Sequence, residues 1–471
     1  MILTPLCYLY NERLRDKQPY IPEGGRLPVD TVLNDAKIFV RGSIVEAGVA
    51  IDEGKIVKIA KETNLPPAST KINLKGHIML PGLIDCHVHL RDQQLAYKED
   101  FFTGTAAAAS GGVTSVVDMP NNKPVTMDAS TLKERMKLAE KKVLVNVAFN
   151  AAFPNSVEEI AEVVEAGAVG FKVYLSNRIG GIDVDDDESL IAAFREAAAN
   201  GVPVMVHAED RKIIEERRRA MEEAKLNDMA AYLFAHPPEA EVRSIQRIIR
   251  LVKKSGVQVH FCHLSSALGL NTVLMAKKAG LPVTCEATPH NLLLSSEQYS
   301  RSGFFALTDP PLRAREDVSA LWSALRRGFI DAIASDHAPH TFEEKNVSSV
   351  WEAKPGVPGL ETTLSLFLTQ VNEGRLPLAE LVRVAAEEPA KIFCLSKRGF
   401  LEEGNWADLV VVDMKREYEV DSSCFLSKAK YSPFDGMRVK GKPVKTFVNG
   451  CLVMDEGEIV AETGAGKVVG G

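Results

Sequence analysis

Two histidines separated by one residue, His87 and His89, stand at the end of an apolar run that is typical of a buried strand over 78–89. Side chains alternate along a strand, so both imidazoles project from one face and could bind a metal ion together. Two packed core histidines are the alternative for an isolated pair. Arg91 adds a third polar side chain on that face, and a fixed cation beside a metal usually serves an anionic ligand. The motif therefore predicts a metal centre that binds an anion.

The segments that would position this centre alternate between strand-like and helix-like patterns. Strands are expected over 78–89, 113–118, 143–149, 168–175, 203–207, 257–263, 281–286 and 330–336. Helical periodicity falls between them, over 101–110, 129–141, 157–165, 188–199, 239–254, 268–279 and 316–327. Eight strand–helix units close a parallel barrel, and no glycine-rich nucleotide motif follows the first strand to favour an open doubly wound sheet. We therefore predict an α/β protein with a (β/α)8 TIM-like barrel over 78–399.

Both ends of the chain differ from its middle. Short alternating strands are expected over 31–77 and 400–461, and each segment contains an Asp-Glu-Gly turn, at 52–54 and 455–457. Neither segment has enough strands for a stable core of its own, so we expect one small β-sandwich domain built from both. Residues 1–30 fit neither domain and form an N-terminal extension of unknown role.

Composition excludes several classes of protein. The 471 residues are 45% hydrophobic, enough for a large core, and the formal net charge of −7 comes without the basic stripe that indicates nucleic-acid binding. Seven scattered cysteines without CxxC spacing are typical of reduced thiols in a cytoplasm. No apolar run approaches the roughly 20 residues of a membrane span, and the N-terminus has no signal peptide. We therefore expect a cytoplasmic protein that binds neither nucleic acid nor membranes.

Further metal-binding side chains fall where the predicted barrel strands end, the place where parallel barrels carry their functional residues. They are Lys172, His207, His263 and Asp336. Four histidines and one aspartate could hold two divalent ions but supply only one negative charge, and a protonated lysine among them would repel both ions. The set is consistent if Lys172 carries an anionic, CO2-derived carbamate that bridges the two metals with a hydroxide. Two such ions bring the pKa of the shared water near neutrality and polarise the carbonyl that it attacks.

With these residues the chain resembles the amidohydrolase superfamily and, within it, the dihydroorotases, over about residues 32–460. In the superfamily the matching positions are metal ligands, with a carboxylated bridging lysine: His87, His89, Lys172, His207, His263 and Asp336. The runs that resemble dihydroorotases in particular are 89–92, 119–122, 284–290, 335–340 and 355–362. Because some bacterial long-form dihydroorotases have aspartate where Lys172 stands, the resemblance is greatest to the dihydroorotase domain of the animal multifunctional pyrimidine enzyme.

This resemblance implies reversible cyclisation of N-carbamoyl-L-aspartate to L-dihydroorotate, with loss of water, in de novo pyrimidine (UMP) biosynthesis. Arg91 could bind the substrate carboxylate bidentately, while Asn121 and His340 add donors. Asp336 would be the general base in hydrolysis and the general acid in cyclisation. We also expect two divalent ions, zinc by preference, a homo-oligomer, and association with other enzymes of the pyrimidine pathway.

Two other interpretations stay open. A hydantoinase, dihydropyrimidinase or allantoinase would share the metal ligands, but a neutral cyclic diamide needs no arginine such as Arg91. A non-catalytic assembly protein on the same scaffold would be expected to have lost ligands, and all six are present here.

Departures from the family affect finer predictions. Residues 92–94 read Asp-Gln-Gln where relatives usually have a Pro-Gly pair, and 176–181 lack a threonine that some relatives place on a substrate-covering loop. Cys262 and Glu286 stand where a few relatives hold a third metal. Strand alternation, however, predicts that Cys262 points away from the face of His263.

Overall fold

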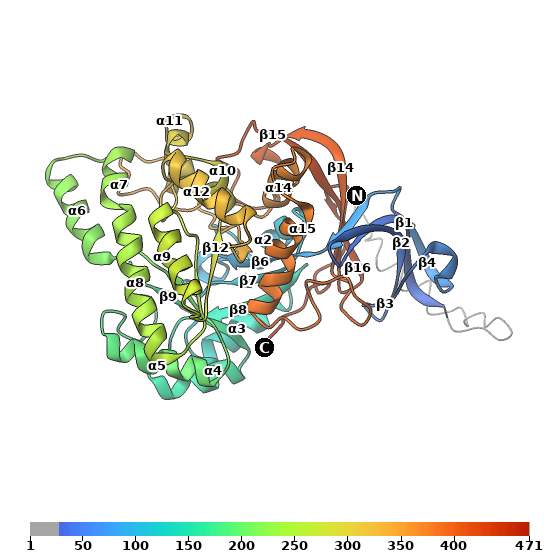
Figure 1. The fold of residues 1–471 in the computed structure, drawn as a ribbon, viewed down its shortest axis with the longest axis horizontal. Helices are drawn as coiled ribbons and strands as arrows, with labels where there is room; N and C mark the ends of the chain where they lie inside the picture. The colour runs from blue at the N-terminus through green and yellow to red at the C-terminus, as the bar shows by residue number, and fades with distance from the viewer. Residues whose placement is uncertain (1–27, 471) are drawn as a thin grey trace.

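A computed structural model describes residues 28–470 and contains two sheets, one rolled into a barrel and one built from both ends of the chain (Figure 1). The predicted extension, 1–30, lies outside the described residues except for its last three. The six described cysteines are free thiols. None of the described helices combines the length and apolarity needed to cross a membrane.

Eight parallel strands form the barrel in chain order. They are β6 (Leu83–Val88), β7 (Val113–Asp118), β8 (Asn146–Ala151), β9 (Ala168–Tyr174), β10 (Val204–His207), β11 (Val259–Phe261), β12 (Val283–Ala287) and β13 (Ala332–Ile333). The first and last strands meet where Val88 bridges His337 and where the N–H of His89 donates to the His337 carbonyl at 2.8 Å. The predicted (β/α)8 barrel is confirmed.

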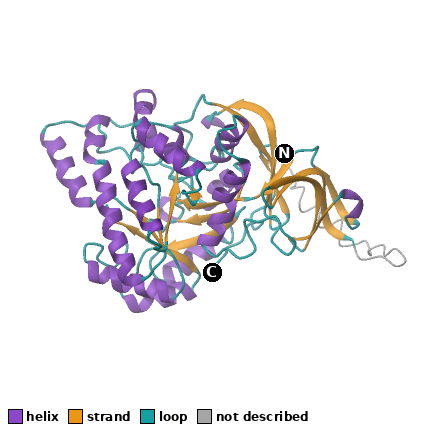
Figure 2. Cartoon of the chain, viewed as in Figure 1, coloured by secondary structure: helices purple, strands orange, loops and turns teal. Residues whose placement is uncertain are grey.

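Helices cover the outside of the barrel (Figure 2). Those that the periodicity predicts are α2 (Phe101–Ser110), α3 (Ala129–Ala139), α4 (Ile160–Glu165), α5 (Asp187–Ala199), α8 (Pro238–Ser255), α9 (Ala267–Lys278) and α12 (Arg315–Arg326). The further ones are α6 (Arg211–Glu223), α7 (Met229–Ala235), α10 (Pro289–Leu293), α11 (Tyr299–Ser302), α13 (Phe342–Lys345), α14 (Thr363–Asn372), α15 (Leu378–Val382) and α16 (Glu388–Ile392). Aspartate caps begin several of them, since the side chains of Asp100 and Asp128 accept the N–H of the third helical residue.

The second sheet has nine strands drawn from both chain ends, which lie together beside the barrel in Figure 1. They are β1 (Val29–Val40), β2 (Ser43–Asp52), β3 (Lys55–Ala60), β4 (Ala68–Asn73), β5 (Ile78–Pro81), β14 (Leu409–Glu419), β15 (Arg438–Val448), β16 (Cys451–Asp455) and β17 (Glu458–Ile459). The two ends join at β5, which pairs in parallel with β1 and antiparallel with β14. A core that includes Ile38, Val49, Val411 and Phe447 lies against this sheet, so the predicted composite β unit is confirmed.

The single strand expected over 78–89 is in fact two strands in different sheets. β5 belongs to the composite sheet and β6 to the barrel, and Gly82 separates them. A Cβ atom at residue 82 would overlap the side chain of Thr114, and the N–H of Gly82 donates to the Asp408 carbonyl at 2.9 Å. A glycine at this position therefore lets the chain pass directly from one sheet to the other.

The segment that follows β17 returns to the barrel and lies beside β8. The N–H of Val147 donates to the Lys467 carbonyl, and the N–H of Val469 donates back to the Val147 carbonyl, both at 2.9 Å. This pairing extends the barrel wall at the start of β8, because β8 meets β9 only from Phe149 onward.

Candidate active site

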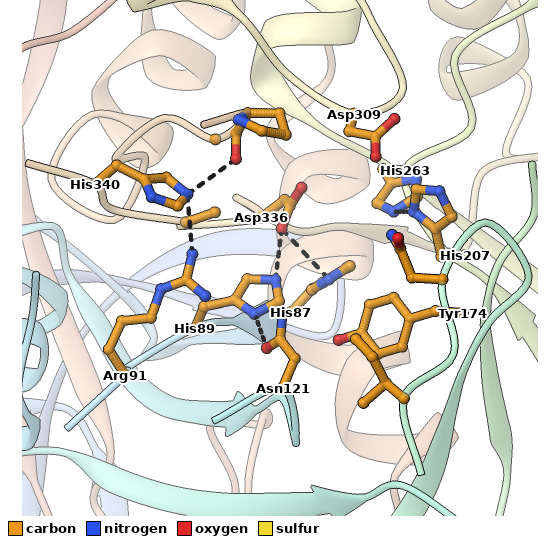
Figure 3. A pocket seen from close by; sticks show the side chains of 15 residues that line it. His87, His89, Arg91, Asn121, Tyr174, His207, His263, Asp309, Asp336 and His340 are labelled. Carbon is orange, nitrogen blue, oxygen red and sulfur yellow. Dashed lines mark hydrogen bonds and ion pairs between the residues drawn. The ribbon is translucent and has the colours of Figure 1, made fainter. Parts of the chain in front are cut away.

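A cavity of about 220 Å³ opens where the barrel strands end (Figure 3). Eight of the nine predicted site residues line it: His87, His89, Arg91, Asn121, His207, His263, Asp336 and His340. The ninth, Lys172, lies on β9 and is 1% exposed, with its Nζ 3.4 Å from Nε2 of His87. The fold therefore brings all nine residues to one place.

The first two histidines face one carboxylate. Nε2 of His87 and Nε2 of His89 lie 3.4 and 3.1 Å from Oδ1 of Asp336. Their other ring nitrogens make hydrogen bonds. His87 Nδ1 lies 2.5 Å from Oε1 of Glu286, and His89 Nδ1 lies 2.7 Å from Oδ1 of Asn121. Histidines that bind metals in proteins are usually oriented in this way, with a carboxylate or carbonyl on the nitrogen away from the metal.

The other two histidines leave ring nitrogens without a hydrogen bond. Nδ1 of His207 lies 3.1 Å from Nε2 of His263. His207 Nε2 lies 3.2 Å from Oε2 of Glu209 without hydrogen-bond geometry, and His263 Nδ1 is buried and unpaired. Leaving a buried polar atom unsatisfied costs free energy, so such atoms indicate a missing ligand. His87, His263 and Asp336 each offer a ligand atom within 4.8 Å of the others. Imidazoles and a carboxylate in this arrangement fit a divalent transition metal.

Burial favours the neutral, metal-binding form of two of these imidazoles. It lowers the pKa of His89 to about 4. The pKa of His263 also falls well below its usual value, through burial and the nearby His207 and Lys172. A neutral imidazole has a free lone pair for a metal ion.

Lys172 is buried without an anionic partner. Its Nζ lies 2.8 Å from Sγ of Cys262 and 5.1 Å from the ring centre of Tyr174, and among the described residues no carboxylate lies within 4.0 Å. The prediction that Cys262 points away from the site is wrong. β11 ends at Phe261, and His263 has a φ of +34°, so the strand alternation on which that prediction relied does not reach these residues.

Arg91 is a buried cation with spare hydrogen-bonding capacity. It is 6% exposed, its Nε has no partner, and its Nη2 lies 3.4 Å from Nε2 of His340. Within residues 28–470 no carboxylate approaches its guanidinium to 4.0 Å. The side chain of Arg135 holds its backbone, donating from Nη1 to the Arg91 carbonyl at 2.9 Å while pairing with Asp118. The guanidinium is therefore positioned and available for an anion.

His340 makes more contacts than the sequence predicts. Its Nδ1 lies 3.0 Å from Nζ of Lys98, and its Nε2 lies 3.0 Å from the carbonyl oxygen of Pro355. Burial lowers the pKa of His340 to about 3, so the ring is neutral. A neutral ring that accepts from Lys98 at Nδ1 carries its proton on Nε2, which then donates to Pro355.

Three of the nine residues adopt a left-handed backbone conformation. Arg91, His263 and Asp336 have φ values of +56°, +34° and +46°. Non-glycine residues pay about 1–3 kcal/mol for such conformations, which concentrate at functional sites. Asp92 and Gln93, part of the Asp-Gln-Gln run that departs from the family pattern, also have positive φ values of +53° and +48°.

Several residues of the site were not predicted in these roles. Glu286 lies 2.5 Å from Nδ1 of His87 and accepts from the backbone N–H of His263 at 3.1 Å, so it positions both of these cavity histidines. Tyr174 and Asp309 line the cavity. Strand periodicity could have found Tyr174, two residues after Lys172 on β9, whereas Asp309 lies in a loop without such a signal.

The fold and the site together define a family. Residues 78–453 match the Amidohydrolase family, and the chain belongs to it. Metal dependence is typical of this family, and the described residues include groups that could hold metal ions.

Individual relatives cover nearly the whole chain. The dihydroorotase of Methanothermobacter thermautotrophicus is 40% identical over 420 residues, which are 88% of this chain and 93% of the relative. The L-hydantoinase of Paenarthrobacter aurescens is 36% identical over 447 residues, 93% of this chain and 98% of the relative. Among solved structures, the L-hydantoinase (dihydropyrimidinase) from Arthrobacter aurescens has a TM-score of 0.90 at 36% identity, covering 94% of this chain and all of that one.

Proposed function

We propose that this enzyme is a dihydroorotase, which interconverts N-carbamoyl-L-aspartate and L-dihydroorotate in de novo UMP synthesis. The observation that best supports this proposal is Arg91, a buried guanidinium with an unpaired Nε at the wall of a cavity lined by histidines. Both substrates have a carboxylate that this cation can bind through two parallel hydrogen bonds. The 40% identical dihydroorotase from M. thermautotrophicus supports the same assignment.

The metal ligands of this proposal are six residues: His87, His89, Lys172 as a carbamate, His207, His263 and Asp336. Two divalent ions, zinc by preference, would supply Lewis-acid activation of water and of the scissile carbonyl when bound. The carbamate on Lys172 is supported by its burial and by the absence of a carboxylate near Nζ among the described residues. Carboxylation would turn an uncompensated ammonium into an anionic ligand.

Asp336 is the proposed proton carrier. Burial alone would raise its pKa, but His87 and His89 hold the pKa well below its usual value, so the carboxylate is ionised. It can therefore accept a proton from the attacking water during ring opening. In cyclisation the same carboxyl group would begin protonated and return that proton to the departing oxygen. Arg91 would meanwhile hold the substrate carboxylate at the cavity wall, with the neutral His340 ring packed beside it.

An L-hydantoinase is the second candidate. The 36% identity and the TM-score of 0.90 to the Arthrobacter enzyme favour it, because the match covers the full fold. A neutral hydantoin ring would, however, leave the Arg91 guanidinium buried without a partner, which is costly. A homo-oligomer, association with other pyrimidine-pathway enzymes and a cytoplasmic location stay predictions.

Metal removal and restoration tests the proposal. Protein prepared without chelator should contain about two divalent ions per chain and should open dihydroorotate and close carbamoyl-aspartate. Chelation should abolish both reactions, and zinc with bicarbonate should restore them. A fully metal-loaded protein that catalyses neither reaction would exclude the proposed function.

A further inference from the structure

Lys345, the last residue of α13, is buried where a charge is least expected. It is 0% exposed, and its Nζ lies 3.1, 3.0 and 3.0 Å from the backbone carbonyl oxygens of Leu307, Lys354 and Gly356. Within the described part of the chain no carboxylate lies within 4.0 Å of this Nζ. Buried ammonium groups are usually paired with an acid. Here three carbonyls instead match the three N–H bonds of one ammonium.

The three carbonyls belong to two separate stretches of the cavity wall. Leu307 lies two residues before Asp309, and Lys354 and Gly356 flank Pro355. Asp309, Pro355 and Gly356 all line the cavity. Lys345 is not among the residues that line the cavity, so its ammonium connects both stretches without entering it.

One of these stretches holds His340. The Nε2–H of His340 donates to the Pro355 carbonyl at 3.0 Å, and the same Nε2 lies 3.4 Å from Nη2 of Arg91, a packing contact because both nitrogens carry N–H groups. A shift of the Pro355 carbonyl would rotate the imidazole. A rotated imidazole would leave the guanidinium of Arg91 without its neighbour.

Close packing around Gly356 restricts the backbone conformation of this stretch. Gly356 has a φ of +139°, and a Cβ atom there would overlap the carbonyl oxygen of Ala338. Its N–H donates to the Leu307 carbonyl at 2.8 Å. Tyr431 adds a contact, with its hydroxyl 3.2 Å from the N–H of His340 and 3.4 Å from the Gly356 carbonyl.

We infer that Lys345 is a positioning residue for the anion site. Its ammonium fixes the residues on both sides of Pro355, so that the Pro355 carbonyl holds the His340 ring in place beside the Arg91 guanidinium. This role rests on the proposed function, because the anion that Arg91 binds is the carboxylate of dihydroorotate. Lys345 would act through the backbone around it, since it does not line the cavity.

The test replaces the ammonium with an apolar side chain of similar length, Lys345→Met. The kcat/KM for dihydroorotate should fall about 10- to 100-fold, mainly through a higher KM, because the anion site is displaced while Asp336 is not. Amide hydrogen exchange of residues 354–357 should become faster in the absence of substrate, with unchanged metal content. The matched control is Lys354→Met, which removes an exposed lysine but keeps the carbonyl that Lys345 binds.

The outcomes distinguish the positioning role of Lys345 from the proposed dihydroorotase function. Wild-type kinetics and wild-type exchange at 354–357 in Lys345→Met would overturn the positioning role. If the wild-type enzyme does not turn over dihydroorotate, the proposed function fails. Hydrogen exchange would still test whether Lys345 holds residues 354–357 in place. If Lys345→Met does not fold, Lys345→Gln keeps one donor and should show a smaller change in the same two measurements. No change in the glutamine variant would also overturn the role.

Discussion

At the scale of single residues, Arg91 is the side chain that would make the site select an anionic substrate over a neutral one. Its guanidinium is buried, and its Nε is unpaired. Removing one partner of a buried charged contact typically costs about 2–5 kcal/mol, so Arg91→Met should lower kcat/KM for dihydroorotate at least about 30-fold. Steady-state kinetics would measure this loss, with metal content unchanged. The control is Arg301→Met, which removes an exposed arginine outside the cavity. Normal kinetics in Arg91→Met would contradict the anion site.

A substitution at Lys172 tests whether this lysine carries a carbamate. Lys172→Ala should lose activity and part of its bound metal while circular dichroism shows an intact barrel, because the bridging anion is gone. A short carboxylic acid such as acetate, added to the variant, should restore part of the activity by replacing the carbamate. Full activity in Lys172→Ala would show that the lysine is only a packing residue.

At the scale of elements, the segment after β17 closes the wall of the barrel at the start of β8. Gly464, Val147 and Val469 each donate a backbone hydrogen bond in this pairing. A variant that ends at residue 462 should lose about 2–4 kcal/mol of unfolding free energy, at about 1 kcal/mol for each lost hydrogen bond plus buried apolar surface. Urea denaturation would measure the loss. The kcat/KM should stay unchanged, since the cavity lies at the opposite ends of the strands. Unchanged stability would show that this pairing contributes little.

Elements with a clear pattern could be predicted from the sequence alone. β7 and α2 have the expected bounds, because an apolar strand-like run and an alanine-rich segment with an aspartate N-cap are local signals. The prediction of one strand over 78–89 is wrong, because hydrophobicity does not tell which sheet a residue joins. The break at Gly82 depends on the side chain of Thr114, which is distant in sequence.

The same limit applies to the site. The predicted metal-binding residues meet at one cavity because strand ends in a parallel barrel converge. Alternation failed at Cys262, beyond the end of β11, where the backbone is no longer extended. The contact of Asn121 with His89, and the carbonyls around Lys345, depend on loop conformations that have no periodic pattern.

At the scale of the whole molecule, a buried histidine makes stability depend on pH. Nδ1 of His236 lies 3.4 Å from Glu209 and 3.3 Å from Asp309. Burial alone would lower its pKa, but these carboxylates raise the pKa from 6.5 to about 9. A raised folded-state pKa means that the stabilisation is complete below about pH 6.5 and is lost as pH rises through about 9.

His236→Gln removes this contribution. The unfolding free energy of the wild type should exceed that of the variant near about pH 6, and the difference should shrink toward about pH 9.5. Urea titrations of metal-saturated protein at several pH values would show it. A difference that stays constant over this range would mean that His236 is not charged in the folded protein.

The central claim is that the barrel cavity is built for a cyclic amide that carries a carboxylate. The most direct test compares kcat/KM of the metal-loaded wild type for L-dihydroorotate and for unsubstituted hydantoin, a neutral ring. A site with a buried cation should prefer dihydroorotate by about 1,000-fold or more, because hydantoin leaves Arg91 unpaired. Faster turnover of hydantoin than of dihydroorotate would contradict this account and identify the enzyme as a hydantoinase.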